Sequence, residues 1–160
     1  MGKKEIIYSD RLAPARKRFA FSHAIRVGNT IYIAGQTPRD KNHVICHKRD
    51  FVGQIEMVFE NMKELLEVAG SSMQDVVKLN FYNRNLWDIN KMMPVFRKYF
   101  GDHVPAMTSV EVVALWHPHI LVEVEAIAVV GEDQIIYEGT EIPGVKYGKR
   151  YTVPDDTEPE

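Results

Sequence analysis

The stretch PAMTSVEVVALWHPHILVEVEAIAVV, residues 105–130, contains two strand-like runs separated by a break at residues 116–119. Side chains alternate between the two faces of a strand, so Glu123 and Glu125 in the second run share one face. We expect the two runs to pair as a hairpin, which places carboxylates among apolar side chains in the middle of a sheet. A buried carboxylate must be paired, hydrogen-bonded or protonated, so this stretch is where chemistry is expected.

The rest of the chain adds strands and helices around this stretch. Further strand patterns lie at residues 19–26, 30–34, 75–82 and, as a short edge strand, 135–137. Apolar residues at three-to-four spacing predict helices over residues 51–69 and 87–100, with Asp50 as an N-cap and Gly70 as a stop for the first. Two such helices can cover only one face of a sheet. The uncovered face predicts an oligomer, because monomers seldom expose a large apolar patch.

The composition is that of a single globular domain. The 160 residues are 45% hydrophobic and 26% charged, and 20 basic against 22 acidic residues give a net charge of −2. This balance gives no general attraction to nucleic acid or to an anionic membrane, and no apolar run is long enough to cross a bilayer. A single cysteine, Cys46, fits a reducing compartment, and the N-terminus lacks a signal-peptide pattern, so we expect a cytoplasmic protein.

A series of short motifs resembles one family, the Rid (reactive intermediate deaminase) or YjgF proteins. In chain order the motifs are FSHAI at 21–25, VGNTIYIAGQ at 27–36, Gln54, FEN at 59–61, AGSS at 69–72, DVVK at 75–78, YFGDH at 99–103, PA at 105–106, SVEV at 109–112 and EVEAIAV at 123–129. No single motif decides the matter, but the series follows the family's order at close to its spacing.

The resemblance implies a chorismate mutase-like α+β fold with a mixed β-sheet and two helices packed on one face. It also implies a homotrimer with ligand sites in the clefts between subunits. The activity it implies is hydrolysis of small enamines or imines, such as 2-aminoacrylate, to keto acids and ammonia, with no metal or organic cofactor. It makes Glu123 the residue that positions the hydrolytic water. The substrate-binding residues that it implies are Phe21, Ala34, Gly35, Met107 and Ser109.

Several positions depart from the pattern of active family members. Met107 stands where those members have an arginine that holds the substrate carboxylate, and methionine offers only an apolar chain there. Phe21 replaces a frequent tyrosine, and Ala34 replaces a frequent serine. The substrate is therefore expected to differ from a standard 2-imino acid, or to meet another cation. The arginines considered for that role are Arg18, Arg26, Arg39 and Arg84.

Each acidic candidate also has a structural interpretation. Glu123 could act as a general base in a partly buried cleft, or it could form an ion pair between subunits. Glu111 and Glu125 are interpreted as structural residues that hold strands or subunits together. His23 is interpreted as a structural histidine whose hydrogen bonds are satisfied.

A metal site is considered and set aside. His43, Cys46 and His47 are ligand types that suit zinc, but their spacing matches no standard site and a fourth ligand is not evident. His117 and His119, in the break between the two runs, are interpreted as solvent-exposed turn residues.

The expected organisation is one domain over residues 1–160 with a family-like core at about 19–131. Residues 1–18 are interpreted as a solvated arm whose basic cluster is not a nucleic-acid contact, because no basic stripe continues elsewhere. Residues 132–160 form an extension whose acidic, proline-bearing tail at 154–160 is predicted to be disordered.

Two functional hypotheses follow. The first is a Rid-like hydrolase of a small enamine or imine, with a small molecule as its only partner besides further copies of the chain. The alternative is a non-catalytic trimeric protein that binds or regulates through the same cleft. Ribonuclease activity, a third possibility, is disfavoured by the near-neutral charge and by the lack of a basic surface carrying aromatic residues.

Overall fold

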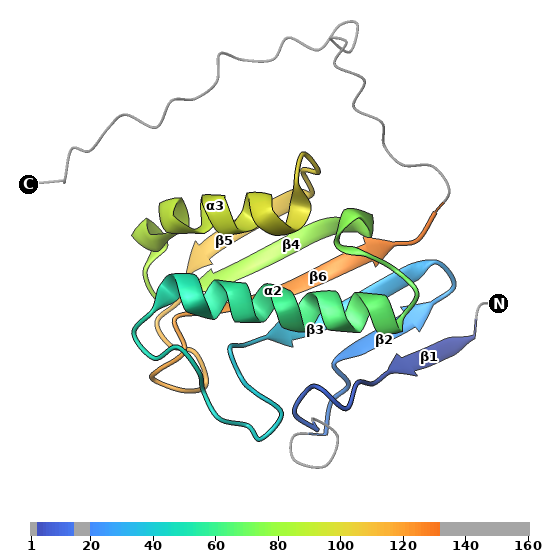
Figure 1. Cartoon of the computed structure of the whole chain (residues 1–160), viewed down its shortest axis with the longest axis horizontal. Coiled ribbons are helices and arrows are strands. Elements are labelled where there is room, and N and C mark those ends of the chain that lie inside the picture. The colour runs from blue at the N-terminus through green and yellow to red at the C-terminus, as the bar shows by residue number, and fades with distance from the viewer. Residues whose placement is uncertain (1–2, 15–19, 132–160) are drawn as a thin grey trace, which may run out of the picture.

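The computed structural model describes residues 3–14 and 20–131. Its elements, in chain order, are β1 (Lys4–Ile7), β2 (Ala24–Val27), β3 (Thr30–Gln36), α2 (Phe51–Val68), the 3₁₀ helix η1 (Met73–Asp75), β4 (Val76–Asn83), the 3₁₀ helix η2 (Leu86–Asp88), α3 (Ile89–Phe100), β5 (Ala106–Glu111) and β6 (Val122–Val129). Helices α2 and α3 contact each other and lie on the same side of one mixed sheet (Figure 1). The predicted α+β class is therefore confirmed. None of the helices described is both long and apolar enough to span a membrane.

The six strands lie in the order β1-β2-β3-β6-β4-β5. Strand β6 pairs antiparallel with both β3 and β4, and β5 pairs parallel with β4 at the edge of the sheet. The predicted hairpin within residues 105–130 is therefore wrong, because β4 lies between β5 and β6. Alternation along a strand identifies its faces but not its neighbours. Helix α3 provides the crossover that a parallel pair requires between β4 and β5.

Helix α2 begins and ends close to the predicted residues. The Asp50 carboxylate accepts a hydrogen bond from the Gly53 N–H at 3.1 Å, which satisfies one of the free N–H groups at the helix start. Gly70 follows the C-terminus with a φ of 73°, a left-handed conformation that glycine adopts without strain. The N-cap and the final glycine both lie within a few residues of the helix ends, so both could be predicted from the sequence.

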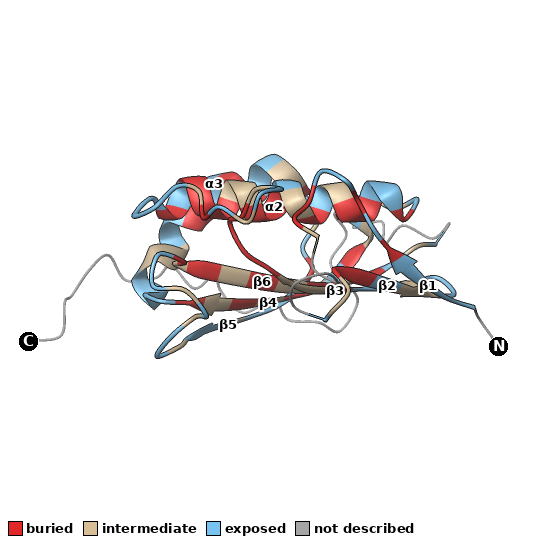
Figure 2. Cartoon of the chain, turned by 90° about the horizontal axis from the view of Figure 1, so that it is seen from below, coloured by how far each residue is buried: buried red, intermediate tan, exposed pale blue. Residues whose placement is uncertain are grey.

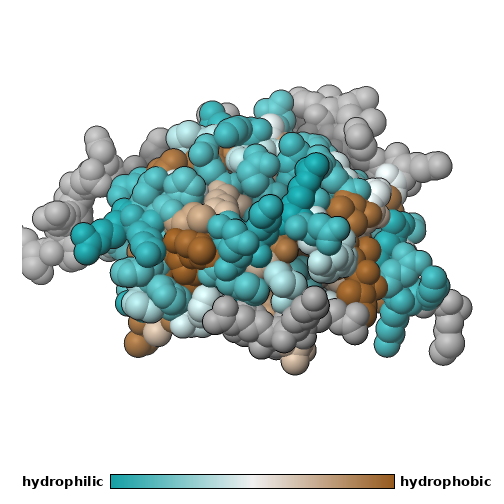
Figure 3. Space-filling view, turned by 60° about the horizontal axis from the view of Figure 1, so that its bottom comes forward, coloured by the Kyte–Doolittle hydropathy of each residue, from teal (hydrophilic) through white to brown (hydrophobic). Residues whose placement is uncertain are grey.

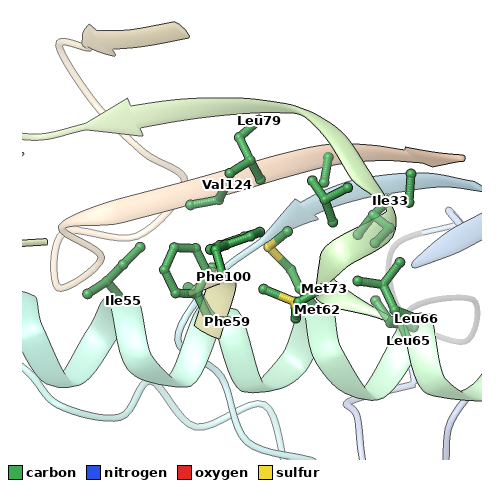
Figure 4. Close-up of a cluster of buried hydrophobic side chains, with 14 of the residues drawn as sticks. Ile33, Ile55, Phe59, Met62, Leu65, Leu66, Met73, Leu79, Phe100 and Val124 are labelled. Atoms are coloured by element: carbon green, nitrogen blue, oxygen red, sulfur yellow. The ribbon is translucent and has the colours of Figure 1, made fainter. Parts of the chain in front are cut away.

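The main core lies between α2, α3 and the sheet. Phe59 of α2 is fully buried, and its ring meets those of Phe81 and Phe100 edge to face, with centroids 6.3 and 5.4 Å away. Figure 4 shows Phe59 and Phe100 beneath Leu79 and Val124 of the sheet. Edge-to-face contacts of this kind add to the free energy gained by burying the rings.

The solvated arm predicted for residues 1–18 is wrong for its described part. Strand β1 pairs antiparallel with β2, with Ile7 opposite Ala24, and Ile7, Leu12 and Ala13 are buried. Three of the four residues of β1 are exposed, so the strand carries no hydrophobic alternation by which it could be recognised.

The two faces of the sheet have different surroundings. Along β6 the residues Val122, Val124, Ala126 and Ala128 are buried, while those between them are half-buried or more exposed. Figure 2 shows both helices on the same side of the sheet and none on the other. We call the side without helices the open face; it carries Glu123. Figure 3 shows the molecule from below and from the helix side, where apolar side chains lie in separate groups between hydrophilic ones.

Some predicted features lie outside the described residues. They are the basic cluster at residues 16–18, the edge strand at 135–137 and the tail at 154–160.

Candidate functional site

Glu123 lines a pocket of about 330 Å³, a volume within the range of small-molecule sites. The lining is formed by Phe21, Gly35, Thr37, Arg39, Trp116 and Glu123. These residues come from the segment before β2, from the end of β3 and the loop after it, from the connection between β5 and β6, and from β6 itself. The pocket thus joins segments that are far apart in the sequence.

Gly35 leaves room for the carboxyl group of Glu123. A Cβ atom placed on Gly35 would lie 2.9 Å from the Glu123 Cδ atom and 3.1 Å from its Cγ atom, closer than ordinary Cβ contacts. The pairing of β3 with β6 is irregular between Ile33 and Gln36, so Gly35 sits where the ladder is locally disrupted. The Glu123 carboxyl group therefore packs directly against the backbone at Gly35.

Burial raises the pKa of Glu123 above the ordinary value of 4.5. The positive charge of Arg39 acts in the opposite direction, and the nearby Glu125 adds a smaller upward effect. The net change moves the pKa toward neutrality, where a carboxyl group can accept and return a proton efficiently.

Arg39 is the basic residue of this pocket. Only 8% of the residue is exposed, its Nε donates to the Thr37 hydroxyl at 3.1 Å, and its guanidinium lies 5.0 Å from the centre of the Trp116 ring. Trp116 and Thr37 thus hold a cation at the pocket wall.

The other arginines considered as substrate-binding residues do not line this pocket or are not among the described residues. Arg26 donates to the carbonyl groups of Gly28 and Ala69 at 2.8 and 2.6 Å. Arg84 follows β4 and is exposed, and Arg18 lies outside the described residues. Among the described candidates, Arg39 is the arginine that lines the Glu123 pocket.

Met107 lies on the opposite side of the sheet from Glu123. In the ladders formed by β4, Met107 is opposite Leu79 and Glu123 is opposite Tyr82. Leu79 and Tyr82 are three positions apart on one strand, so they and their partners point to opposite faces. Met107 and Glu123 of one chain therefore cannot line the same pocket.

Ala34 and Ser109 also lie outside the Glu123 pocket. Ala34 lines a separate hollow with Tyr32, Lys78 and Glu125 among its other lining residues. The Ser109 hydroxyl accepts a hydrogen bond from the side-chain amide of Asn83 at 2.8 Å. Of the residues that the resemblance implies, one chain brings together Phe21, Gly35 and Glu123.

Three side chains interpreted as structural make the contacts expected of that role. Glu125 accepts hydrogen bonds from the Asn80 amide at 2.8 Å and from the Tyr82 hydroxyl at 2.9 Å. Glu111 accepts from the backbone N–H of Leu86 at 2.9 Å, at the start of η2. The His23 Nε2 atom lies 2.7 Å from the carbonyl oxygen of Ala13, where it donates.

The histidines and the cysteine of the loop after β3 do not converge. Within the described residues, no group of three or more His, Cys, Asp or Glu side chains is arranged to hold a metal ion. The Cys46 thiol instead lies 3.6 Å from the carbonyl oxygen of Val44.

Sequence reasoning missed two residues of the pocket, Thr37 and Trp116. Trp116 had been assigned only to the break between two strands. A bulky aromatic residue in a polar connection is the available signal, but its position beside Arg39 depends on how two distant loops meet.

The site and the fold together define a small α+β protein with a carboxylate pocket, and comparisons with known proteins agree. A profile of the family described as Endoribonuclease L-PSP matches residues 11–130. A RutC family protein of Pyrococcus abyssi is 43% identical over 125 residues, which cover 78% of this chain and 96% of the relative.

A 2-iminobutanoate/2-iminopropanoate deaminase of Dermatophagoides farinae is 36% identical over 133 residues, covering 81% of this chain and 99% of that one. The crystal structure of RidA from a Psychrobacter species has a TM-score of 0.72 and 35% identity, covering 79% of this chain and 99% of that one. The chain therefore belongs to the endoribonuclease L-PSP family, the Rid or YjgF proteins.

Proposed function

We propose that this protein hydrolyses a small enamine or imine and that Glu123 positions and activates the attacking water. The observation that carries the proposal is the half-buried Glu123, with a raised pKa, in a pocket of ligand size. The relative from Dermatophagoides farinae, which is named as an imine deaminase, supports the same class of reaction.

The reaction adds one water and releases one ammonia. An enamine first tautomerises to its imine. Glu123 removes a proton from water while the water oxygen bonds to the imine carbon. The C=N electron pair moves to nitrogen, which takes that proton back from Glu123. The resulting carbinolamine then breaks its C–N bond as its hydroxyl proton is transferred to the departing nitrogen, which leaves a carbonyl compound and ammonia. A carboxyl group with a raised pKa suits both directions of proton transfer.

Arg39 is the residue we assign to charge recognition in place of the arginine that Met107 replaces. It lines the pocket from the wall formed with Thr37 and Trp116, and a guanidinium can bind a carboxylate through two parallel hydrogen bonds. The proposed substrate is therefore anionic, with its charge at the wall of the pocket that carries Arg39.

Assembly into a trimer through the open face is part of the proposal. The open face exposes Ile25 and Tyr32, which lie opposite each other on β2 and β3, and apolar surface of this kind favours association. Met107 lies on the edge strand β5 and is 45% exposed, so a neighbouring copy can contact it there. It cannot line the pocket of its own chain. Light scattering after size-exclusion chromatography should give three times the chain mass of 18.4 kDa.

Ammonia release from freshly generated 2-aminoacrylate and a panel of other imines tests the activity. Glu123→Gln should lower kcat by about 10²–10⁴-fold, the usual contribution of a general base. The matched control is Glu125→Gln, which removes a carboxylate from the same face of the same strand. It should lower kcat much less, because Glu125 is held by Asn80 and Tyr82 outside the pocket.

The results also separate the alternatives. Equal losses in the two variants would contradict the assignment of Glu123. If Met107→Arg alone is active, Arg39 does not replace the missing arginine. If neither the parent nor Met107→Arg releases ammonia, the non-catalytic binding protein becomes the better description.

A further inference from the structure

A second pocket of about 370 Å³ lies beside the Glu123 pocket and shares Arg39 and Trp116 with it. Its other lining residues are His43, Ile45, Lys48, His117 and His119. As far as the described residues go, this lining contains no aspartate or glutamate. A pocket with an arginine, a lysine and three histidines favours a negatively charged group that accepts hydrogen bonds.

The hydrogen bonds of two histidines fix which ring nitrogen donates. The Nδ1 atom of His117 accepts from the backbone N–H of His119 at 3.1 Å, and the Nδ1 atom of His43 lies 3.4 Å from an Arg39 nitrogen, which can only donate. Both Nδ1 atoms are therefore acceptors, and the proton of each neutral ring is on Nε2. Each of these two lining residues can therefore donate a hydrogen bond through Nε2 even when its ring is uncharged.

Gln54 of helix α2 holds the two loops that form this pocket. Its side chain is fully buried and donates to the carbonyl groups of His47 at 3.1 Å and His119 at 2.7 Å. Its side-chain oxygen accepts from the backbone N–H of Leu121 at 2.8 Å. The loops are therefore fixed relative to each other from below, which gives the pocket a defined shape.

We infer that the second pocket binds an oxyanion group, a carboxylate or a phosphate, at the far end of the substrate whose imine end reaches Glu123. Arg39 belongs to both pockets, so one extended molecule can occupy them together. The Ile45 side chain and the Trp116 ring provide apolar walls for the short hydrocarbon chain between the ends. The substrate class is an imino dicarboxylate or its phosphorylated equivalent. The placement of an imine at Glu123 rests on the proposed function, whereas the assignment of the oxyanion pocket does not.

Calorimetric titration with inorganic phosphate and, separately, with glutarate tests the pocket without any turnover. Lys48→Met should weaken binding of both probes by about fivefold to tenfold, as expected for the loss of one charged contact at a partly exposed site. The control Lys41→Met removes the same charge from the same loop but from outside the lining, and should change binding by less than about twofold. Thermal unfolding of each variant establishes that it is folded.

Three results would overturn the inference. Absence of binding by the folded parent excludes the site, and equal weakening in Lys41→Met shows only a general effect of charge. If a short single-stranded RNA binds the parent more tightly than either probe and loses its binding in Lys48→Met, the pocket recognises nucleic-acid phosphate instead. If phosphate binds more tightly than glutarate, the phosphorylated class is selected over the dicarboxylate class.

Kinetics then connect the pocket to the reaction. Lys48→Met should raise KM for 2-iminoglutarate about fivefold to tenfold at a similar kcat, and leave KM for the monoanionic 2-iminobutanoate unchanged. Equal increases for both imines would contradict the two-ended substrate. If the parent hydrolyses neither imine, the proposed deamination fails, while the titrations still decide whether the oxyanion pocket exists.

Discussion

The two faces of strand β6 differ in what they contribute to the protein. Toward the helices, Val122 and Val124 are fully buried in the main core. Toward the open face, Glu123 is half-buried in a pocket and its pKa is raised by burial. Adjacent residues of one strand therefore face a packed core on one side and a pocket on the other, because successive side chains point in opposite directions.

Burial has opposite effects on stability on the two faces of the strand. On the covered face, burial stabilises each apolar side chain by about 1.5–3 kcal/mol relative to exposure. On the open face, burial of a carboxylate opposes ionisation and lowers stability at neutral pH. The proposed role of Glu123 in catalysis would account for a destabilising carboxylate at this position.

The largest effect is expected from the covered face. Phe59→Ala should lower the free energy of unfolding by about 3–5 kcal/mol, because it leaves a cavity among Phe81, Phe96 and Phe100. Denaturant unfolding measures the change. Tyr32→Ala on the open face, where the residue is 51% exposed, should cost less than about 1 kcal/mol within one chain.

A loss below about 1 kcal/mol for Phe59→Ala would contradict this description of the core. If the loss of unfolding free energy in Tyr32→Ala grows with protein concentration, further copies of the chain cover the open face.

A smaller effect is expected where the core supports the loops around the site. Gln54→Leu removes the partners of the His47 and His119 carbonyls and of the Leu121 N–H, and should cost about 2–4 kcal/mol. Melting temperature and denaturant midpoint measure it. Gln74→Leu, an exposed position with one contact of 3.4 Å to the Tyr99 carbonyl, is the control and should change little. Equal destabilisation by both variants would mean that Gln54 does not hold these loops.

The smallest effect concerns pH and the open face. Below the ordinary carboxyl pKa of 4.5, Glu123 is protonated in both the folded and the unfolded chain, so its stabilising contribution is fully present there. That contribution is lost as pH rises through the higher pKa of the folded state. Glu123→Gln should therefore raise the melting temperature at pH 7 and raise it less at pH 4.

Melting curves across this pH range make the comparison. The control Glu67→Gln, on the exposed side of α2 and 3.8 Å from Lys63, should show no comparable gain at pH 7. If Glu123→Gln instead lowers the melting temperature relative to the parent at pH 7 but not at pH 4, the attraction of Arg39 outweighs the effect of burial.

Features set by interactions between neighbouring residues could be predicted from the sequence, whereas features set by the pairing of distant segments could not. Helix α2 was predicted almost to the residue, because its cap, apolar stripe and final glycine are all local. The predicted hairpin was wrong because strand pairing joins segments that are distant in the sequence. The connection over residues 112–121 lets β5 and β6 lie on either side of β4. Strand β1 was missed because its side chains are mostly exposed.

Local patterns in the sequence show that Glu123 and Glu125 share one face of a strand, that two helices can cover only one face of the sheet, and that the chain resembles the family to which it belongs. Alternation, amphipathic spacing and motif order are properties of neighbouring residues, and no fold is needed to read them. The tertiary structure is needed to place Arg39 and Trp116 beside Glu123, and Met107 on the other side of the sheet. Those relations depend on strand order and on how the loops meet, because they are set by contacts between segments that the sequence keeps apart.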